Sequence, residues 1–263
     1  MNTLQWIVLA TVLSGVASAM LASGFLLAGA RVRNYLLPHM VSFATGTLLG
    51  AAFIGLLPRA IETAGAGNAG RIGLAVLGGL LAFFVLEKLV LWRHCHHDTC
   101  EVHAHDDKAA HDASGTLILV GDGFHNLLDG VLIAAAFLTD FHLGVVTTLA
   151  VFAHELPQEL GDIAILLHSG MSRGRALVLN LLVSLTSVVG AVLAYFWLAG
   201  AEAILPYVLS VAAASFVYVA VADLIPGLHR RLEPGAAVSQ FTLIVLGVLV
   251  VVGATRIAHG LTH

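Results

Sequence analysis

Two apolar segments of the chain read GDGFHNLLDG (residues 121–130) and HELPQELGD (residues 154–162). Both are rich in metal-binding side chains, although the chain as a whole is 59% hydrophobic and only 11% charged. Ionisable groups inside a bilayer are costly, so they usually face a helix-bundle interior and mark an ion or substrate path. The contrast indicates a polytopic membrane protein that handles a metal ion.

Apolar runs long enough to cross a bilayer, about 20 residues each, recur along the whole chain, and the mean hydropathy is +0.94. We predict an all-α polytopic membrane protein with one transmembrane domain over residues 1–263. Eight spans are expected, at residues 5–29, 35–58, 71–92, 115–138, 143–168, 175–199, 203–226 and 239–258.

The N-terminal run contains a sequence that resembles a signal-peptidase site, VASA at residues 16–19. Residues 1–5 carry no Lys or Arg, however, and the apolar run continues well past Ala19. A retained first span is therefore expected, with a cleaved signal as the alternative.

The basic residues predict the orientation of the spans. Nine of the twelve Lys and Arg residues fall in one set of loops, and three fall in the opposite set: Arg59, Arg71 and Arg256. Because cytoplasmic loops carry the excess of basic residues, both termini are expected outside the cell membrane.

A weak internal symmetry is also visible. The second span ends in GLLP (residues 55–58) and the seventh in DLIP (residues 223–226), and these two spans run in opposite directions. An inverted repeat of spans 1–3 and 6–8 around spans 4 and 5 would produce this pattern. The alternative is that proline simply ends two apolar helices.

Helical spacing collects the polar residues of the two segments on single faces. In the fourth span the face holds Asp122, His125 and Asp129, with Asn126 at its edge. The fifth-span face holds Glu155, Gln158, Glu159 and Asp162, with His154 beside them. A short connection makes these spans antiparallel neighbours, so we expect a metal site between them at mid-membrane depth. Imidazole and carboxylate ligands without thiolate suit Zn²⁺, Fe²⁺, Mn²⁺ and Cd²⁺.

At these residues the chain resembles the ZIP (Zrt/Irt-like) family of metal transporters, in a prokaryotic-type form. HNLLDG at residues 125–130 is similar to the family element HNxxDG, and residues 154–162 are similar to HExPxExGD. The resemblance implies transport of divalent metals, mostly Zn²⁺, into the cytoplasm as substrate, with no separate cofactor. It also implies an elevator-like motion and a homodimer.

The resemblance implies two metal positions. Carried over by position, His125, His154, Glu155 and residue 158 line the first, and Asn126, Asp129, Glu155 and residue 158 line the second. We add Glu159, which lies on the same helical face. The chain departs from the family pattern at Gln158 and Gly55, where many members have stronger ligands. One principal ion with a weaker second position is therefore expected.

The connection over residues 94–114 is rich in His and acidic residues and contains both cysteines, Cys95 and Cys100. Such tracts bind borderline divalent metals, and the predicted orientation places this one in the cytoplasm. The alternative is a linker with incidental metal affinity.

Rival functions are a metal-sensing receptor and an intramembrane zinc metalloprotease. A protease of that kind uses HExxH, but here the fifth position of the motif is Gln158. We therefore expect a transporter and not an enzyme. The net charge of −4, without a basic stripe, argues against nucleic acid as a partner. The expected partners are the metal ion, the lipid bilayer and a second copy of the chain.

Overall fold

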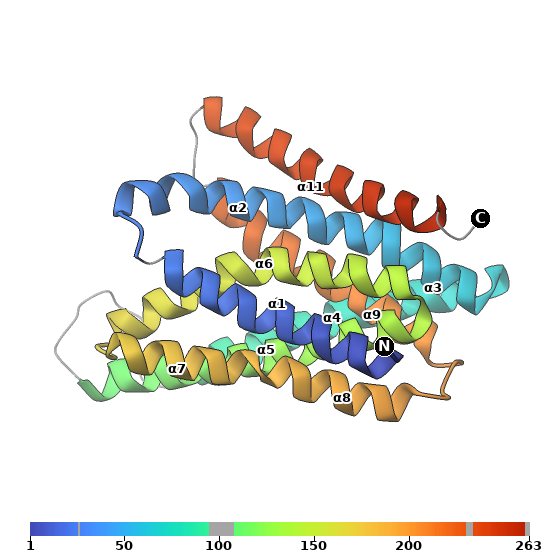
Figure 1. Ribbon diagram of the computed structural model, residues 1–263, viewed down its shortest axis with the longest axis horizontal. Coiled ribbons are helices and arrows are strands. Elements are labelled where there is room, and N and C mark those ends of the chain that lie inside the picture. Colours follow the sequence, from blue (N-terminus) through green and yellow to red (C-terminus); the bar gives the residue numbers. More distant parts are fainter. Residues whose placement is uncertain (26, 95–107, 230–233, 261–263) are drawn as a thin grey trace.

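The computed structural model describes residues 1–25, 27–94, 108–229 and 234–260, and every regular element in them is helical (Figure 1). The α-helices are α1 (Thr3–Phe25), α2 (Ala30–Gly50), α3 (Leu57–Ala64), α4 (Ala69–His94), α5 (Lys108–Thr139), α6 (Phe141–His168), α7 (Arg173–Ser184), α8 (Thr186–Leu198), α9 (Leu205–Tyr218), α10 (Ile225–His229) and α11 (Pro234–Gly260). The predicted all-α class is confirmed. The expected His-rich connection lies mostly outside the described residues, and α5 already begins at Lys108.

Six of the helical segments in the described ranges are long and apolar enough to cross a membrane: residues 3–25, 31–64, 69–89, 173–198, 205–229 and 235–256. The helices that carry the polar clusters, α5 and α6, are not among the six. Large apolar side chains also cover the outside of the bundle; Trp197 is 87% exposed and Leu74 is 69% exposed. An apolar outer surface of this extent suits lipid and not water. The protein is therefore a multi-pass membrane protein.

The helices run back and forth along the long axis of the molecule (Figure 1). The start of α1 and the end of α11 lie at one end, and α2 and α7 begin at the opposite end (Figure 1). The most extensive helix pairs are α5 with α8, α2 with α11, α1 with α6, and α4 with α9. The ligand helices α5 and α6 also pack against each other.

Glycine allows the closest of these contacts. A Cβ atom on Gly130 of α5 would lie 1.8 Å from the carbonyl oxygen of Ser187 on α8. A Cβ atom on Gly190 of α8 would lie 2.0 Å from the carbonyl oxygen of Leu127. Small residues let membrane helices approach until their backbones touch. The backbone of α5 is therefore held against α8 on the side next to the metal-ligand residues.

Two π-helical segments, η1 (Ala51–Leu56) and η3 (Val219–Leu224), continue α2 and α9. Each has six residues and ends two residues before a proline, Pro58 or Pro226. We expected the second span to end at residue 58, but the helix continues to Ala64. Proline is tolerated in the first turn of a helix, so Pro58 fits the first turn of α3, which begins at Leu57 directly after η1. The expected sixth span is divided at Leu185 into α7 and α8.

Candidate metal site

A tight turn aligns the two ligand helices. Only Asp140 separates α5 from α6, and its Oδ1 accepts hydrogen bonds from the amides of His142 (2.9 Å) and Leu143 (3.0 Å). This side chain satisfies two of the free amides at the start of α6. His125 lies 14 residues before the end of α5, and His154 lies 13 residues after the start of α6. Antiparallel packing therefore places the two imidazoles at one depth.

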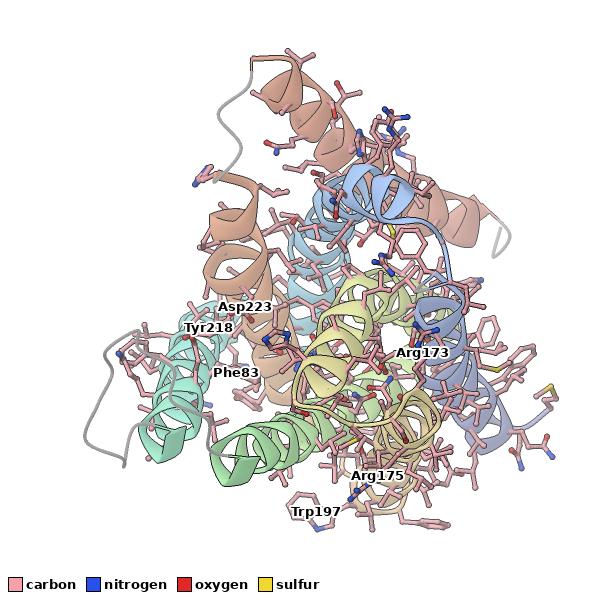
Figure 2. The ribbon with its side chains drawn as sticks, turned by 90° about the vertical axis from the view of Figure 1, so that its left-hand side faces the viewer. Phe83, Arg173, Arg175, Trp197, Tyr218 and Asp223 are labelled. Carbon is pink, nitrogen blue, oxygen red and sulfur yellow. The ribbon has the colours of Figure 1, made fainter. Side chains whose placement is uncertain are left out.

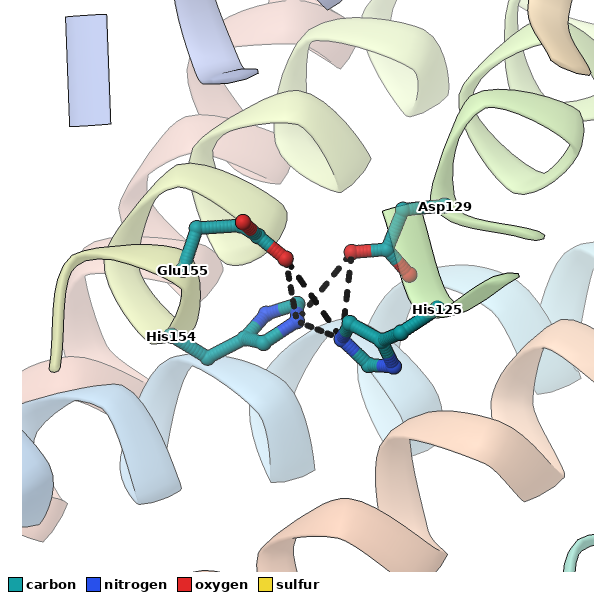
Figure 3. A group of neighbouring side chains, drawn as sticks. All are labelled: His125, Asp129, His154 and Glu155. Atoms are coloured by element: carbon teal, nitrogen blue, oxygen red, sulfur yellow. Dashed lines mark hydrogen bonds and ion pairs between the residues drawn. The ribbon is translucent and has the colours of Figure 1, made fainter. Parts of the chain in front are cut away.

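Four side chains converge between the helices (Figure 3). His125 and Asp129 come from α5, and His154 and Glu155 come from α6; one ligand atom from each lies within 4.8 Å of the others. The Nε2 atom of His154 is 3.3 Å from Nε2 of His125 and 3.1 Å from Oδ2 of Asp129. The Nε2 atom of His125 is 3.5 Å from Oε1 of Glu155 and 3.8 Å from Oδ2 of Asp129.

These separations suit one small cation. Zinc binds histidine nitrogen and carboxylate oxygen at about 2.0–2.1 Å, so a tetrahedral site separates its ligand atoms by about 3.3–3.4 Å. Five of the six separations, between 3.1 and 3.8 Å, fall around that value, and the sixth, between the two carboxylates, is within 4.8 Å. The four atoms therefore lie close to the positions that a tetrahedral ion requires.

A backbone carbonyl of α6 orients the imidazole ring of His154. Its Nδ1 lies 3.0 Å from the carbonyl oxygen of Ala150, one turn earlier on α6. A carbonyl accepts a hydrogen bond only from a protonated nitrogen, so the Nδ1–H tautomer leaves the Nε2 lone pair directed into the cluster. The local sequence of α6 thus supplies both the ligand and the group that orients it.

The buried carboxylates of the cluster lack partners that would stabilise their negative charge. Asp129, His154 and Glu155 are each 1–2% exposed. Oδ2 of Asp129 and both carboxylate oxygens of Glu155 have no hydrogen-bond partner among the described residues. Buried carboxylates are costly unless they are paired or coordinate a metal. A divalent cation would supply the two positive charges that these carboxylates lack.

Two other predicted ligands form a second polar layer around Asp122, which is 5% exposed. Its Oδ1 accepts hydrogen bonds from Nδ2 of Asn126 (2.9 Å) and from Nε2 of Gln158 (3.4 Å). Its Oδ2 has no hydrogen-bond partner among the described residues. Asp122 was expected on the ligand face but not among the ligands, and in the structure it lies outside the four-residue cluster. The metal roles of Asn126 and Gln158 stay predictions.

Glu159 faces another part of the bundle. Its carboxylate accepts hydrogen bonds from Nδ2 of Asn180 and from Oγ of Ser184 (2.7 Å), both on α7. These bonds occupy the carboxylate and connect α6 to α7. The predicted metal role of Glu159 is untested, but its contacts in the structure are those of a helix-packing residue. Sequence spacing could not find this pairing, because α7 is a separate segment.

A buried histidine–carboxylate cluster inside a bundle of membrane-spanning helices defines the class: an integral membrane protein with a candidate metal site in its bundle. The family model described as ZIP Zinc transporter matches residues 4–117 and 92–255. The chain belongs to this family, as the two sequence elements predicted.

Several curated relatives are similar over most of the chain. It is 33% identical over 228 residues to "Zinc transporter ZIP13" of Pongo abelii, covering 82% of the chain and 66% of the relative. It is 34% identical over 269 residues to "Zinc transporter ZIP5" of Homo sapiens, covering 79% of the chain and 50% of the relative. The matches thus span one half to two thirds of the length of these relatives.

Proposed function

We propose that this protein moves Zn²⁺ across the membrane through the cluster of His125, Asp129, His154 and Glu155. The observation that carries the proposal is that one ligand atom from each of these four side chains lies within 4.8 Å of the others, between two bundle helices. Family membership and relatives named as zinc transporters support it, and favour a transporter over an enzyme. The two imidazoles and two carboxylates bind the ion as substrate, and protonation of these ligands is one route to its release.

The partly exposed ligand indicates the side on which the cluster is open. The His125 side chain is 22% exposed, whereas those of Asp129, His154 and Glu155 are nearly inaccessible. Asp223 is exposed on η3 and lies near enough to both histidines for their charges to interact. In Figure 2, Asp223 and Tyr218 lie on the helix formed by α9 and η3, on its side toward α4. In the orientation proposed below, η3 is in the cytoplasmic half of the seventh span, so we infer that Asp223 accepts the ion as the ion leaves the cluster on the side of His125.

We further infer eight spans arranged as an inverted repeat. Such a repeat relates span 1 to 6, span 2 to 7, span 3 to 8 and span 4 to 5. Under this relation the helix pair α4–α9 corresponds to the pair α11–α2. The same relation maps α1–α6 onto α8–α5, and these four pairs have the most extensive contacts in the bundle. The π-helical segments η1 and η3 have the same length and the same distance from a proline. The matching helix pairs, the equal length of η1 and η3 and their equal distance from a proline thus support the repeat. The alternative, in which proline simply ends two apolar helices, does not account for the matching pairs.

The orientation and the metal range complete the proposal. The nine-to-three distribution of basic residues supports an orientation with both termini outside, and the proposed transport runs from outside into the cytoplasm. The mixed imidazole and carboxylate ligands suit Zn²⁺ first and also admit Cd²⁺, Fe²⁺ and Mn²⁺. Amide groups at Asn126 and Gln158 make a second ion position weaker than the first. Assembly into a homodimer in the bilayer belongs to the same proposal.

Radiolabelled Zn²⁺ uptake into proteoliposomes containing the purified protein tests the function. We expect saturable uptake that is lost in Glu155→Ala and retained in Glu202→Ala, a matched exposed carboxylate outside the cluster. Competition with Cd²⁺, Fe²⁺ and Mn²⁺ measures the metal range. Equal uptake by wild type and Glu155→Ala would overturn the proposal, and tight Zn²⁺ binding without uptake would indicate a sensor.

A further inference from the structure

A cavity far from the metal site lies where four helices meet at one end of the bundle. It occupies about 370 Å³ between the end of α1, the start of α2, the end of α6 and the start of α7. Four of its nine lining residues are large and apolar: Leu27, Ile163, Leu167 and Leu177. This is the volume and apolar lining that ligand sites commonly have.

Two arginines face this apolar cavity. Arg33 comes from α2, and Arg173 is the first residue of α7. No acidic residue contributes to the described wall. Among the described residues, Arg173 forms no ion pair, so no described carboxylate neutralises its guanidinium charge. Figure 2 shows Arg173 beside α1, and Arg175 on the other side of α7.

The backbone amides at the start of α7 are a third group that favours an anion, in addition to the two arginines. Helix α7 has 12 residues, and its N-cap residue, Ser172, makes no side-chain hydrogen bond to the free amides of the first turn. Free amides and the helix dipole favour negative charge at such a terminus. The cavity therefore combines two guanidinium groups, a helix N-terminus and a hydrocarbon wall within one opening.

We propose that this cavity binds an anionic phospholipid. The phosphate lies between Arg33 and Arg173, and the start of an acyl chain lies against Leu167 and Leu177. Guanidinium groups recognise phosphate through paired hydrogen bonds, and basic pockets between membrane helices bind acidic headgroups. The apolar wall favours a lipid over free phosphate, because inorganic phosphate has no hydrocarbon to bury. The site is independent of the metal ligands and of the proposed transport.

Native mass spectrometry of the detergent-purified protein tests this assignment, with dioctanoyl phosphatidylglycerol, dioctanoyl phosphatidylcholine and inorganic phosphate as separate probes. We expect one saturable phosphatidylglycerol adduct on the wild type. Loss of a charged hydrogen bond to phosphate should weaken this adduct by about tenfold or more in Arg173→Gln and Arg33→Gln. Arg175→Gln is the matched control and should bind as the wild type does.

A second variant fills the cavity without removing charge. Gly174 lines the cavity, and a Cβ atom there would meet nothing within 4 Å, so Gly174→Leu is compatible with the fold. We expect it to exclude the lipid while both arginines stay in place. Unchanged phosphatidylglycerol binding in Gly174→Leu and Arg173→Gln would overturn the proposal. Equal binding of phosphatidylcholine, or competition by inorganic phosphate alone, would overturn it as well.

Discussion

Neighbouring acidic residues on α6 have different environments. Glu155 lies in the ligand cluster, and neither of its oxygens has a hydrogen-bond partner among the described residues. Glu159, one turn later, accepts hydrogen bonds from Asn180 and Ser184. A buried charge without a partner destabilises the apo protein and is available to a cation, whereas a partnered charge stabilises helix packing. Two substitutions separate these roles.

Glu155→Gln should change stability and zinc binding in opposite directions. The substitution removes a buried, uncompensated charge, so the melting temperature of the metal-free protein should stay equal or rise. Zinc at 100 times its Kd stabilises a protein by about 2.7 kcal/mol, and this gain should largely disappear in the variant. Thermal unfolding in detergent with and without Zn²⁺ measures both effects. A full zinc-induced shift in Glu155→Gln would contradict the assigned ligand role.

Asn180→Ala should give the converse result. It leaves the buried Glu159 carboxylate without one of its donors, which costs about 1–3 kcal/mol in unfolding free energy. The zinc-induced shift in melting temperature should be retained, because Asn180 donates to Glu159 and not to the four-residue cluster. If the zinc response falls together with stability, Glu159 belongs to the metal site as the sequence predicted.

At the scale of helices, the contact between α5 and α8 determines where the α5 ligands lie. Gly130 directly follows the ligand Asp129 and touches the backbone of Ser187. Any side chain at position 130 must push α5 away from α8, because a backbone carbonyl cannot move aside as a flexible side chain can. The metal cluster and this helix pair are therefore mechanically connected.

Gly130→Ala is expected to lower the unfolding free energy by about 1–3 kcal/mol, as overpacking of a close contact usually does. It should also weaken zinc binding, since Asp129 moves with the displaced backbone. Gly161→Ala on α6 is the matched control, because a Cβ atom there meets nothing within 4 Å. The measurement is thermal unfolding in detergent with a zinc titration. Equal stability of the two variants would show that α5 and α8 do not approach as closely as described.

At the scale of the whole molecule, the even number of predicted spans agrees with the location of the start of α1 and the end of α11 at one end (Figure 1). We expect an epitope tag at either terminus to be accessible to externally added protease in intact cells. A tag between α6 and α7, at residues 169–172, should be protected until the membrane is permeabilised. Protected termini with an accessible tag at residues 169–172 would reverse the proposed direction of transport.

Much of the fold could be predicted because the bilayer restricts the chain so strongly. Backbone groups in hydrocarbon must be satisfied within the segment, so long apolar runs imply helices. Helical spacing likewise placed His125 with Asp129 and His154 beside Glu155. The continuation of the helix through Pro58, the break at Leu185 and the start of α5 at Lys108 did not follow, because hydrophobicity alone does not register π-helical segments or local helix ends.

The sequence by itself determined the helical class, the family and the two helices that carry the metal ligands, because each depends on composition or on spacing within one segment. Only the tertiary structure decided which polar groups meet. It brought four ligand atoms to coordination distance, paired Glu159 with α7 and joined Arg33 to Arg173 across an apolar cavity. The physical reason is that helix rotation and approach are set by side-chain packing between segments, such as Gly130 against Ser187, which no single segment encodes.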